Sequence, residues 1–251
     1  MSNGPTEAII LAGGKAERLG AAAGGKPKPL VAVAGRPLMS YQIASLAKAG
    51  VERVLVSCGA GLADLFVSEL DGLPVEVVPV EEPEPLGRGG GLRRAAEARN
   101  TDGDVYALNG DELLPIDFAA LAARHREANV LATIVVAQPR SPFGVVELTP
   151  GDLVCGFDEG ARVPWWVSCG VYVLSEQALH RLPERGDHES TTFPDLASER
   201  ALAAFRHDGV WLTVNTPKDL KRAEEYLMAN PDWAAEGASL LSSIGPPPGR
   251  A

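Results

Sequence analysis

Short apolar runs alternate with segments of helical periodicity along the first half of the chain. The run at 7–12 (EAIILA) is almost entirely apolar, and it predicts a buried strand, as do comparable runs at 51–57, 75–80 and 105–108. Between these strands, apolar residues that repeat at helical spacing predict helices at 38–49, 64–70 and 91–99. Near-continuous apolar strands that alternate with helices indicate a mostly parallel sheet covered on both faces.

The second half mixes helices with shorter strands. The apolar pattern predicts strands at 130–137, 143–148, 153–157, 166–174 and 211–214. It predicts helices at 118–128, 176–181, 193–200 and 217–227. Since no internal repeat or linker separates the halves, we expect one domain over 1–236, with a first half at about 7–115 and a second half at about 116–228. The segment 237–251, rich in glycine, serine and proline, is expected to be a mobile tail.

Composition and charge narrow the classes of function. The chain has 251 residues, 45% hydrophobic and 22% charged, which is an ordinary globular balance, and its formal net charge is -10. Nucleic-acid binding needs an excess of lysine and arginine, so the acidic balance argues against it. No apolar run reaches the roughly 18 residues of a membrane helix, and no basic signal segment opens the chain. The three cysteines lack metal-type spacing, which predicts reduced thiols and a cytoplasmic location.

The candidate chemistry begins with a glycine-rich, basic segment at 11–29, directly after the first predicted strand. Gly13 and Gly14 allow the backbone to approach a ligand closely and to point N–H groups at phosphate oxygens. Five basic residues and one acidic residue follow up to position 36: Lys15, Glu17, Arg18, Lys26, Lys28 and Arg36. A locally basic loop in an acidic chain predicts triphosphate binding, although it lacks the Walker A pattern. The alternative is a mobile loop whose lysines are solvated.

Asp111 directly follows another predicted strand, within the sequence Asn109-Gly110-Asp111. Ligands bind beyond the carboxyl ends of parallel strands, so we expect Asp111 on the same rim of the sheet as Gly13 and Gly14. A carboxylate at a strand end suits Mg²⁺, which prefers oxygen ligands. Taken alone, however, Asn-Gly-Asp is also an ordinary turn sequence.

Several motifs, in the right order, resemble those of the sugar-phosphate nucleotidyltransferases. The first is Leu11-Ala12-Gly13-Gly14, followed by Arg18-Leu19 and by Pro27-Lys28-Pro29. The resemblance extends from about residue 7 to residue 227 and implies a Rossmann-like three-layer α/β/α nucleotidyltransferase fold with a mostly parallel mixed sheet. In that family the loop wraps the triphosphate, which makes residues 11–14 nucleotide-binding and gives Arg18 and Lys28 catalytic contacts to phosphate. Glu17, in place of threonine, and the insertion at 21–25 depart from the family pattern.

The resemblance also assigns the residues that face the base and the metal. Glu84-Pro85-Leu86-Gly87 looks like the segment that faces the base, which makes Glu84 and Gly87 nucleotide-binding, and Arg88 replaces a threonine there. Asn109 is carried over as nucleotide-binding and Asp111 as a catalytic residue and ligand of Mg²⁺.

The resemblance assigns the second ligand of Mg²⁺ less directly. Thr213 stands where many members have an aspartate, and Asn215 matches the asparagine that binds the metal in related branches. The alternative role for Asn215 is to cap the helix that begins at Pro217.

The residues that contact the sugar are expected in later segments of the chain. The run at 143–147 (FGVVE) and the run at 166–174 (WVSCGVYVL) resemble family segments that touch the sugar. The resemblance therefore implies sugar-binding roles for Gly144, Ser168 and Cys169. The segment Phe157-Asp158-Glu159-Gly160-Ala161, which resembles the family's F-x-E-K-P, adds Glu159 as an acceptor for a sugar hydroxyl. Gly160 stands where the family often has a lysine near the sugar phosphate, and Arg162 is the candidate substitute.

Together these motifs imply an enzyme that transfers a nucleotidyl group from a nucleoside triphosphate to a sugar 1-phosphate, with Mg²⁺ as cofactor. The form around Glu84 looks more like that of mannose- and heptose-1-phosphate guanylyltransferases, which favours GTP, whereas UTP and dTTP remain alternatives. A catalytically silent regulatory relative and a dinucleotide-binding oxidoreductase are the competing classes. We expect no nucleic-acid or membrane partner, and a homo-oligomer stays open.

Overall fold

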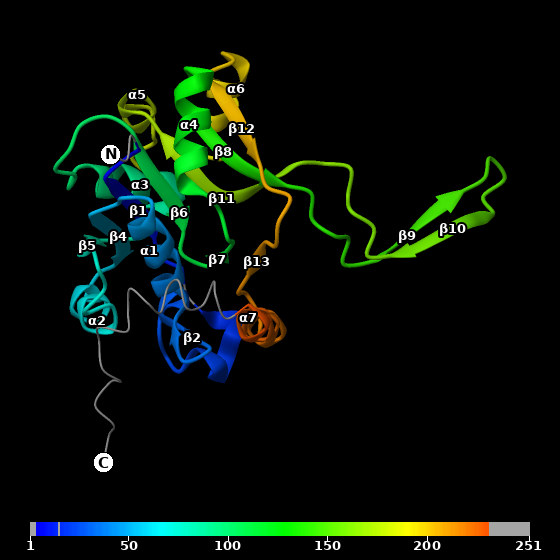
Figure 1. Ribbon diagram of the computed structural model, residues 1–251, viewed down its shortest axis with the longest axis horizontal. Coiled ribbons are helices and arrows are strands. Elements are labelled where there is room, and N and C mark those ends of the chain that lie inside the picture. The colour runs from blue at the N-terminus through cyan, green and yellow to red at the C-terminus, as the bar shows by residue number, and fades with distance from the viewer. Residues whose placement is uncertain (1–3, 15, 231–251) are drawn as a thin grey trace.

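A seven-stranded sheet runs through the computed structural model, which describes residues 4–14 and 16–230 (Figure 1). From edge to edge its strands are β12 (Leu202–Arg206), β8 (Ala132–Ala137), β11 (Val167–Leu174), β6 (Val105–Asn109), β1 (Glu7–Leu11), β4 (Arg53–Gly59) and β5 (Glu76–Glu82). Within this sheet β11 is antiparallel to both of its neighbours, β6 and β8, and every other adjacent pair is parallel. The sheet is therefore mixed but mostly parallel, as the sequence predicts.

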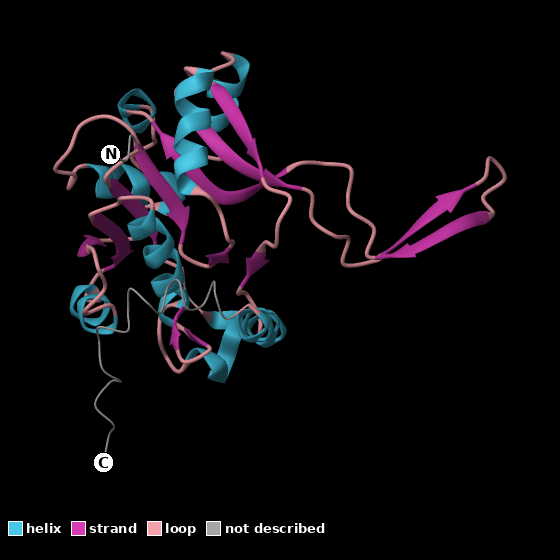
Figure 2. Ribbon diagram, in the orientation of Figure 1, coloured by secondary structure: helices cyan, strands magenta, loops and turns pink. Residues whose placement is uncertain are grey.

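Helices cover both faces of this sheet and make three layers (Figure 2). Because side chains alternate along a strand, Ala8 and Ile10 of β1 face one core and Ile9 faces the other. The first core also receives α1 (Leu38–Lys48), α2 (Ala63–Glu69) and α4 (Phe118–Ala128). The second receives α3 (Gly87–Ala96), α5 (Glu176–His180) and α6 (Thr192–Ser198). The predicted α/β/α architecture is confirmed.

A third, smaller core lies under the glycine-rich segment. Leu19 of the 3-10 helix η1 (Glu17–Ala23) packs there with Leu227 of α7 (Pro217–Ala229), so the last helix of the described chain contacts the first loop. The short elements around this core are η2 (Lys28–Leu30), the pair β2 (Ala32–Val33) and β3 (Arg36–Pro37), and the pair β7 (Glu112–Leu113) and β13 (Leu212–Thr213). This core brings the end of the second half back to the strand ends of the first half.

A long ribbon, which we call the arm (residues 139–163), projects from the body of the molecule (Figure 1). It carries the antiparallel hairpin of β9 (Gly144–Leu148) and β10 (Val154–Glu159). The three cores of the described residues contain no side chain from 138–166. The side chains of the arm therefore add nothing to the hydrophobic cores of the body.

Helix α3 and strand β12 differ most from the sequence prediction, and the short elements η1, η2, β2, β3 and β7 were not predicted. Helix α3 begins at Gly87 rather than at residue 91, although glycine is a poor helix former, and the edge strand β12 was missed because its alanine-rich sequence does not favour a strand. Lys15 and the predicted tail at 237–251 lie outside the described residues. Over 4–14 and 16–230, no helix has both the length and the apolar character needed to span a bilayer.

A buried carboxylate fastens the amino-terminal end of the sheet. Glu7, which is 2% exposed, accepts hydrogen bonds from the backbone N–H groups of Asn100 (2.8 Å) and Thr101 (3.1 Å) and from the Thr101 hydroxyl (2.7 Å). The guanidinium groups of Arg53 and Arg99 lie 3.3 and 3.4 Å from its oxygens. Burial alone would raise the pKa of Glu7, but the hydrogen bonds outweigh burial and hold this pKa below its ordinary value.

We expect Glu7→Gln to lower the free energy of unfolding by about 3 kcal/mol, because it leaves buried guanidinium charge without its partner. Urea denaturation measures this loss. Glu76→Gln is the matched control, since Glu76 also pairs with Arg53 (3.1 Å) but its side chain is 62% exposed. The control should lose less than about 1 kcal/mol. Equal losses in the two variants would contradict a buried anchor at Glu7.

Candidate functional site

The carboxyl ends of β1 and β6 lie side by side where the glycine-rich segment begins. Leu11 pairs with Asn109, and the N–H group of Gly110 donates to the Leu11 carbonyl at 2.9 Å. A Cβ atom on Gly110 would lie 2.6 Å from that carbonyl oxygen and 2.8 Å from Cγ of Pro29. Glycine at 110 is therefore required for the two strand ends and the Pro-Lys-Pro segment to approach one another this closely.

Four of the predicted catalytic and metal-binding side chains meet at this rim. The ammonium of Lys28 donates to Oδ2 of Asp111 at 2.9 Å and to Oδ1 of Asn215 at 2.8 Å. Nη2 of Arg18 lies 3.5 Å from the same Asn215 oxygen. The side chains of Lys28 and Asp111 are 13% and 27% exposed, so their charges are partly shielded from water. The structure thus assembles Arg18, Lys28, Asp111 and Asn215 as one cluster.

Asn215 reaches the cluster because its backbone is fastened to the segment after Asp111. Strands β7 and β13 pair antiparallel, and the N–H group of Val214 donates to the Asp111 carbonyl at 3.1 Å. Helix α7 is capped by Thr216, which forms a capping box with Asp219. The alternative role of Asn215 as the helix cap is therefore wrong, and its side chain faces Lys28 instead.

The oxygens of Asp111 and Asn215 suit a hard divalent cation. Both oxygens contact one ammonium nitrogen, so a single point lies within reach of both side chains. Mg²⁺ is commonly held by one or two protein oxygens, while water and substrate phosphates supply its other ligands. Among the described residues no group of three or more His, Cys, Asp or Glu side chains is arranged to hold a metal. The pair fits a metal site that is completed by a substrate phosphate.

Two buried polar side chains, Gln42 and Glu112, hold the turn around Asp111. Neither was predicted from the sequence. Nε2 of Gln42 donates to the carbonyls of Asn109 and Glu112, both at 2.8 Å. The carboxylate of Glu112, which is 7% exposed, accepts from Nε1 of Trp211 at 2.6 Å. Burial and the neighbouring charge of Asp111 raise the pKa of Glu112 to about 8. Together these bonds tie α1 and the Trp211 segment to the turn.

A sequence signal existed for Gln42 but not for Glu112. Gln42 lies between Leu38 and Leu46, four residues from each, so it interrupts an apolar stripe that faces the core. A polar residue in such a stripe needs a buried partner. Glu112, by contrast, looks like an ordinary loop carboxylate in the sequence.

On the nucleotide side, the buried carboxylate belongs to Glu82 rather than to Glu84. Glu82 is 8% exposed and accepts from the Ser57 hydroxyl at 2.7 Å and from the N–H group of Leu86 at 2.9 Å, which shapes the turn into α3. Glu84 lies at the surface, with its side chain 60% exposed and 3.4 Å from the Arg185 guanidinium. Glu84 is thus accessible to a ligand, whereas Glu82 is a structural support.

The glycines at the start of α3 allow close packing against the loop at 183–188. A Cβ atom on Gly87 would lie 2.6 Å from the Gly186 carbonyl, and one on Gly90 would lie 2.5 Å from the Glu184 carbonyl. The N–H group of Gly89 also donates to the Gly186 carbonyl at 2.8 Å. Close approach of this loop therefore accounts for small residues in this part of the motif.

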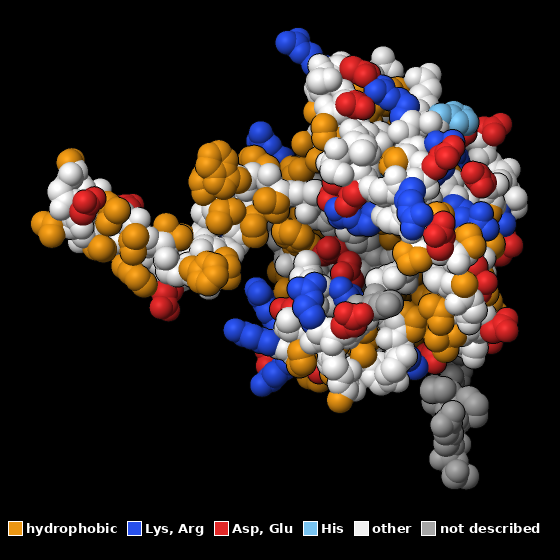
Figure 3. Space-filling model, turned by 180° about the vertical axis from the view of Figure 1, so that it is seen from behind, with side chains coloured by type: hydrophobic (Ala, Val, Ile, Leu, Met, Phe, Trp, Pro, Cys, Tyr) orange, Lys and Arg blue, Asp and Glu red, His pale blue; other side chains and the backbone are white. Residues whose placement is uncertain are grey.

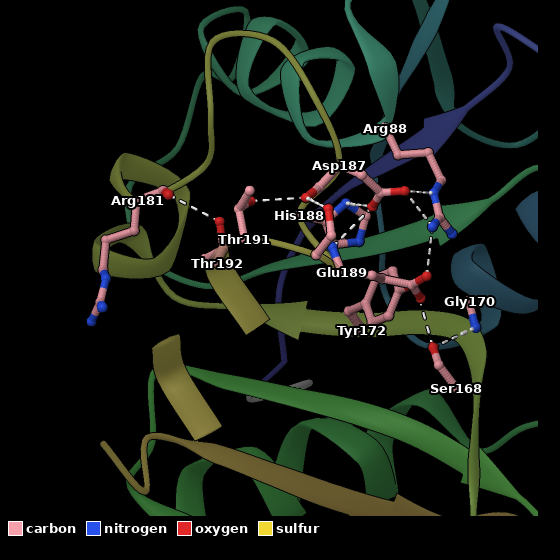
Figure 4. A network of polar contacts seen from close by, with 11 residues as sticks. Arg88, Ser168, Gly170, Tyr172, Arg181, Asp187, His188, Glu189, Thr191 and Thr192 are labelled. Atoms are coloured by element: carbon pink, nitrogen blue, oxygen red, sulfur yellow. Dashed lines mark hydrogen bonds and ion pairs between the residues drawn. The ribbon is translucent and has the colours of Figure 1, made fainter. Parts of the chain in front are cut away.

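Arg88, which stands in place of a threonine, anchors a polar network beside this loop (Figure 4). Its Nε lies 2.8 Å from Asp187 and its Nη2 lies 2.6 Å from Glu189. Glu189 also accepts from the Tyr172 hydroxyl at 2.9 Å, and the Ser168 hydroxyl donates to the Tyr172 hydroxyl oxygen at 3.5 Å. Burial would lower the pKa of Arg88, but the two carboxylates outweigh burial and raise it. The network therefore joins α3 to β11 near the rim.

The four predicted sugar-binding residues do not come together. Ser168 is partly exposed at the start of β11, but Cys169 is fully buried in the first core, where burial raises the pKa of its thiol to about 12. Gly144 and Glu159 are paired across the hairpin of the arm, which projects away from the body (Figure 1). The cluster of Arg18, Lys28, Asp111 and Asn215 and the two residues of the arm therefore lie in separate regions of the structure.

Comparison with known proteins agrees with the α/β fold described above. The model of the family described as nucleotidyl transferase matches residues 7–230, and the chain belongs to this family. It is 31% identical over 240 residues to the mannose-1-phosphate guanylyltransferase of Mycobacterium tuberculosis, a match that covers 91% of this chain and 66% of that protein.

A second relative and a solved structure extend the comparison. The chain is 30% identical over 223 residues to the mannose-1-phosphate guanylyltransferase catalytic subunit beta of Drosophila pseudoobscura pseudoobscura; the match covers 85% of this chain, which spans only 60% of that relative. The crystal structure of HddC from Yersinia pseudotuberculosis complexed with GMP-PN has the same fold, with a TM-score of 0.68. That match has 22% sequence identity and covers 89% of this chain and 100% of the HddC chain.

His188 lies beneath the Arg88 network, in edge contact with Tyr172 and Phe193 at centroid distances of 5.3 and 4.8 Å. It is fully buried, and within 4–14 and 16–230 neither ring nitrogen has a hydrogen-bond partner. Burial lowers the pKa of His188 to about 4, with Arg88 acting in the same direction and the carboxylates of Asp187 and Glu189 opposing it. The folded protein thus keeps this imidazole neutral.

We expect His188 to make the fold less stable as pH falls from about 6.5 toward 4, because the unfolded chain binds its proton at higher pH. The slope should approach about 1.4 kcal/mol per pH unit and disappear in His188→Phe, as measured by urea unfolding at several pH values. The control is His180→Phe, since the side chain of His180 is 77% exposed, and it should keep the wild-type slope. The same slope in His188→Phe would show that other groups cause it.

Proposed function

We propose that this protein transfers a nucleotidyl group from a nucleoside triphosphate, with GTP favoured, to a sugar 1-phosphate in a Mg²⁺-dependent reaction. The products are a nucleotide sugar and pyrophosphate. The observation that carries the proposal is the contact of Lys28 with both Asp111 and Asn215 at the strand ends. A cation, a carboxylate and an amide oxygen around one point suit a triphosphate and its metal ion.

In the proposed reaction, an oxygen of the sugar 1-phosphate attacks the α-phosphorus while the bond to the bridging oxygen breaks and pyrophosphate leaves. Lys28 and Arg18 offset negative charge on the triphosphate, and the exposed backbone at Gly13 and Gly14 offers N–H groups to it. Mg²⁺ held by Asp111 and Asn215 would supply further charge neutralisation. Since no covalent enzyme intermediate is needed, catalysis rests on positioning and electrostatics.

Several observations support GTP as the donor. The exposed carboxylate of Glu84 is able to accept hydrogen bonds from N1–H and the 2-amino group of guanine. The segment 80–85 contains no glutamine, the residue expected of uridylyl and thymidylyl transferases. Relatives are named mannose-1-phosphate guanylyltransferases, and the similar HddC chain was crystallised with GMP-PN. Mannose 1-phosphate is therefore the first acceptor to test, and UTP and dTTP are the competing donors.

A cytoplasmic location belongs to the same proposal. All three cysteines are free, with Cys58 and Cys169 buried and Cys155 exposed. Unpaired cysteines are usual in proteins of compartments where thiols stay reduced.

Asp111→Asn should lower Mg²⁺-dependent pyrophosphate release by at least about a hundredfold, because it removes the charged ligand of the cluster. Release is followed with GTP and mannose 1-phosphate. Metal binding by the same variant, measured by titration calorimetry in the presence of GTP, should weaken in parallel. Asp102→Asn, which changes an exposed carboxylate outside the cluster, is the control and should behave as wild type. Full turnover in Asp111→Asn would refute the metal assignment.

A panel of GTP, UTP, dTTP, CTP and ATP tests the donor, and release should be fastest with GTP. Glu84→Ala should raise KM for GTP by about tenfold or more, because it removes a charged acceptor for guanine, and should leave KM for UTP unchanged. Pyrophosphate release that is fastest with UTP or dTTP would make the protein a pyrimidine nucleotidyltransferase. No release with any donor and any of several sugar 1-phosphates would favour the catalytically silent relative.

A further inference from the structure

Glu112 and Trp211 form a polar contact directly beside the cluster of Arg18, Lys28, Asp111 and Asn215. Glu112 is 7% exposed, and Nε1 of Trp211 donates to its Oε2 at 2.6 Å. The ring of Trp211 packs against the first core, so apolar contacts hold its body while the carboxylate holds its N–H group. A carboxylate costs free energy to bury, so stability alone does not explain this contact.

The contact crosses the short strand pair that joins the two candidate metal ligands. In the pair of β7 and β13, Glu112 lies opposite Thr213, and Trp211 is the diagonal neighbour two residues away. Asp111 directly precedes β7, and Asn215 lies two residues beyond β13. The distance between the side-chain oxygens of these two ligands therefore depends on the register of β7 against β13.

Apolar packing specifies this register only loosely. Apolar residues alternate at Val210, Leu212 and Val214, and the last two face the third core. Because the side-chain period of a strand is two, a shift of β13 by two residues keeps an apolar side chain toward that core. Such a shift moves Asn215 by about 7 Å, since a strand rises about 3.4 Å per residue. A hydrogen bond is directional, so the bond of Trp211 to its single acceptor excludes the shift.

The β7 side of the pair is held firmly, whereas β13 has less support. Nε2 of Gln42 on α1 donates to the carbonyls of Asn109 and Glu112, both at 2.8 Å. Within the described residues β13 pairs with β7 and with no strand of the seven-stranded sheet. The bond from Trp211 therefore connects the less supported strand to the one that α1 holds in place.

We propose that Glu112 and Trp211 are positioning residues that set the distance between Asp111 and Asn215, and that this distance favours Mg²⁺ over larger cations. The inference rests on the proposed function, in which these two side chains hold the metal ion. Mg²⁺ requires near-octahedral geometry with oxygens at about 2.1 Å, whereas Ca²⁺ accepts more variable distances of about 2.3–2.6 Å. Loss of the bond between Glu112 and Trp211 therefore weakens the binding of Mg²⁺ more than that of Ca²⁺.

Titration calorimetry with MgCl₂ and with CaCl₂, in the presence of GTP and without sugar phosphate, measures this preference. Trp211→Phe keeps an apolar ring but removes the donor, and Glu112→Met removes the acceptor. Each should raise the dissociation constant for Mg²⁺ by at least about tenfold and that for Ca²⁺ by less than about threefold. The double variant should bind Mg²⁺ no more weakly than either single variant, because both remove the same bond.

Two further variants separate the bond from other effects. Glu112→Gln keeps an acceptor oxygen and should bind both ions as wild type does. Trp165→Phe is the matched control, because this tryptophan is 73% exposed and lies two residues beyond the arm, whose hydrophobic side chains stand out from the body in Figure 3. Unchanged Mg²⁺ binding in Trp211→Phe, or equal weakening of both ions, overturns the proposal. The same loss in Glu112→Gln overturns it as well, because the charge of Glu112 would then be what acts on the ion.

Amide hydrogen exchange of the metal-free protein tests the register without the ion and without turnover. The N–H group of Val214 donates to the Asp111 carbonyl at 3.1 Å. In Trp211→Phe its exchange should accelerate by at least about tenfold more than that of Val54, which is buried in β4. Equal acceleration at Val214 and Val54 would reveal a general loss of stability and contradict a positioning role, as would unchanged exchange at Val214. If wild type releases no pyrophosphate with any donor, the proposed function fails, while hydrogen exchange still decides whether the bond fixes β13.

Discussion

The candidate site depends on one polar contact, the bridge of Lys28 between Asp111 and Asn215. These residues lie 83 and 187 positions from Lys28 in the sequence. The contact requires that β1 and β6 end side by side, that η2 turns beneath them, and that β13 returns to pair with β7. Partly buried charges interact more strongly than exposed ones, so this bridge links all three segments. The third core supports the bridge by packing α7 against η1.

The sequence predicted the fold and the cluster by different signals, and neither prediction was complete. Strong periodicity located β1, β6 and α4, because buried strands and amphipathic helices repeat their apolar residues regularly. Motif resemblance identified Arg18, Lys28, Asp111 and Asn215, which the structure brings together. Edge strand β12 was missed because an edge strand has few neighbours and its alanines give little strand signal. Glu112 and Glu82 were missed because burial of a carboxylate is decided by tertiary packing, which short sequence patterns do not record.

A residue that departs from the family pattern, Arg88, is explained by the side chains that it contacts. Arg88, where a threonine is usual, meets Asp187 and Glu189, so the added charge is balanced within one network. That network lies directly against the glycines of α3, where the loop at 183–188 approaches too closely for a side chain. The large Arg88 and the glycines on either side of it are therefore required by the same close packing against the loop at 183–188. The fully buried His188 lies beneath this network, in edge contact with Tyr172 and Phe193.

The contrast between body and arm has a physical reason. The rim carries fixed charges on strand ends that are held by buried partners such as Gln42 and Trp211. Sugars differ in the placement of their hydroxyl groups, so their recognition is better carried by an element that varies without disturbing the core. The arm satisfies this condition, since none of its side chains enters the three cores of the described residues. The apolar side chains of its hairpin stay exposed, because the body leaves them uncovered. The hairpin can therefore change in sequence without a change in the three cores.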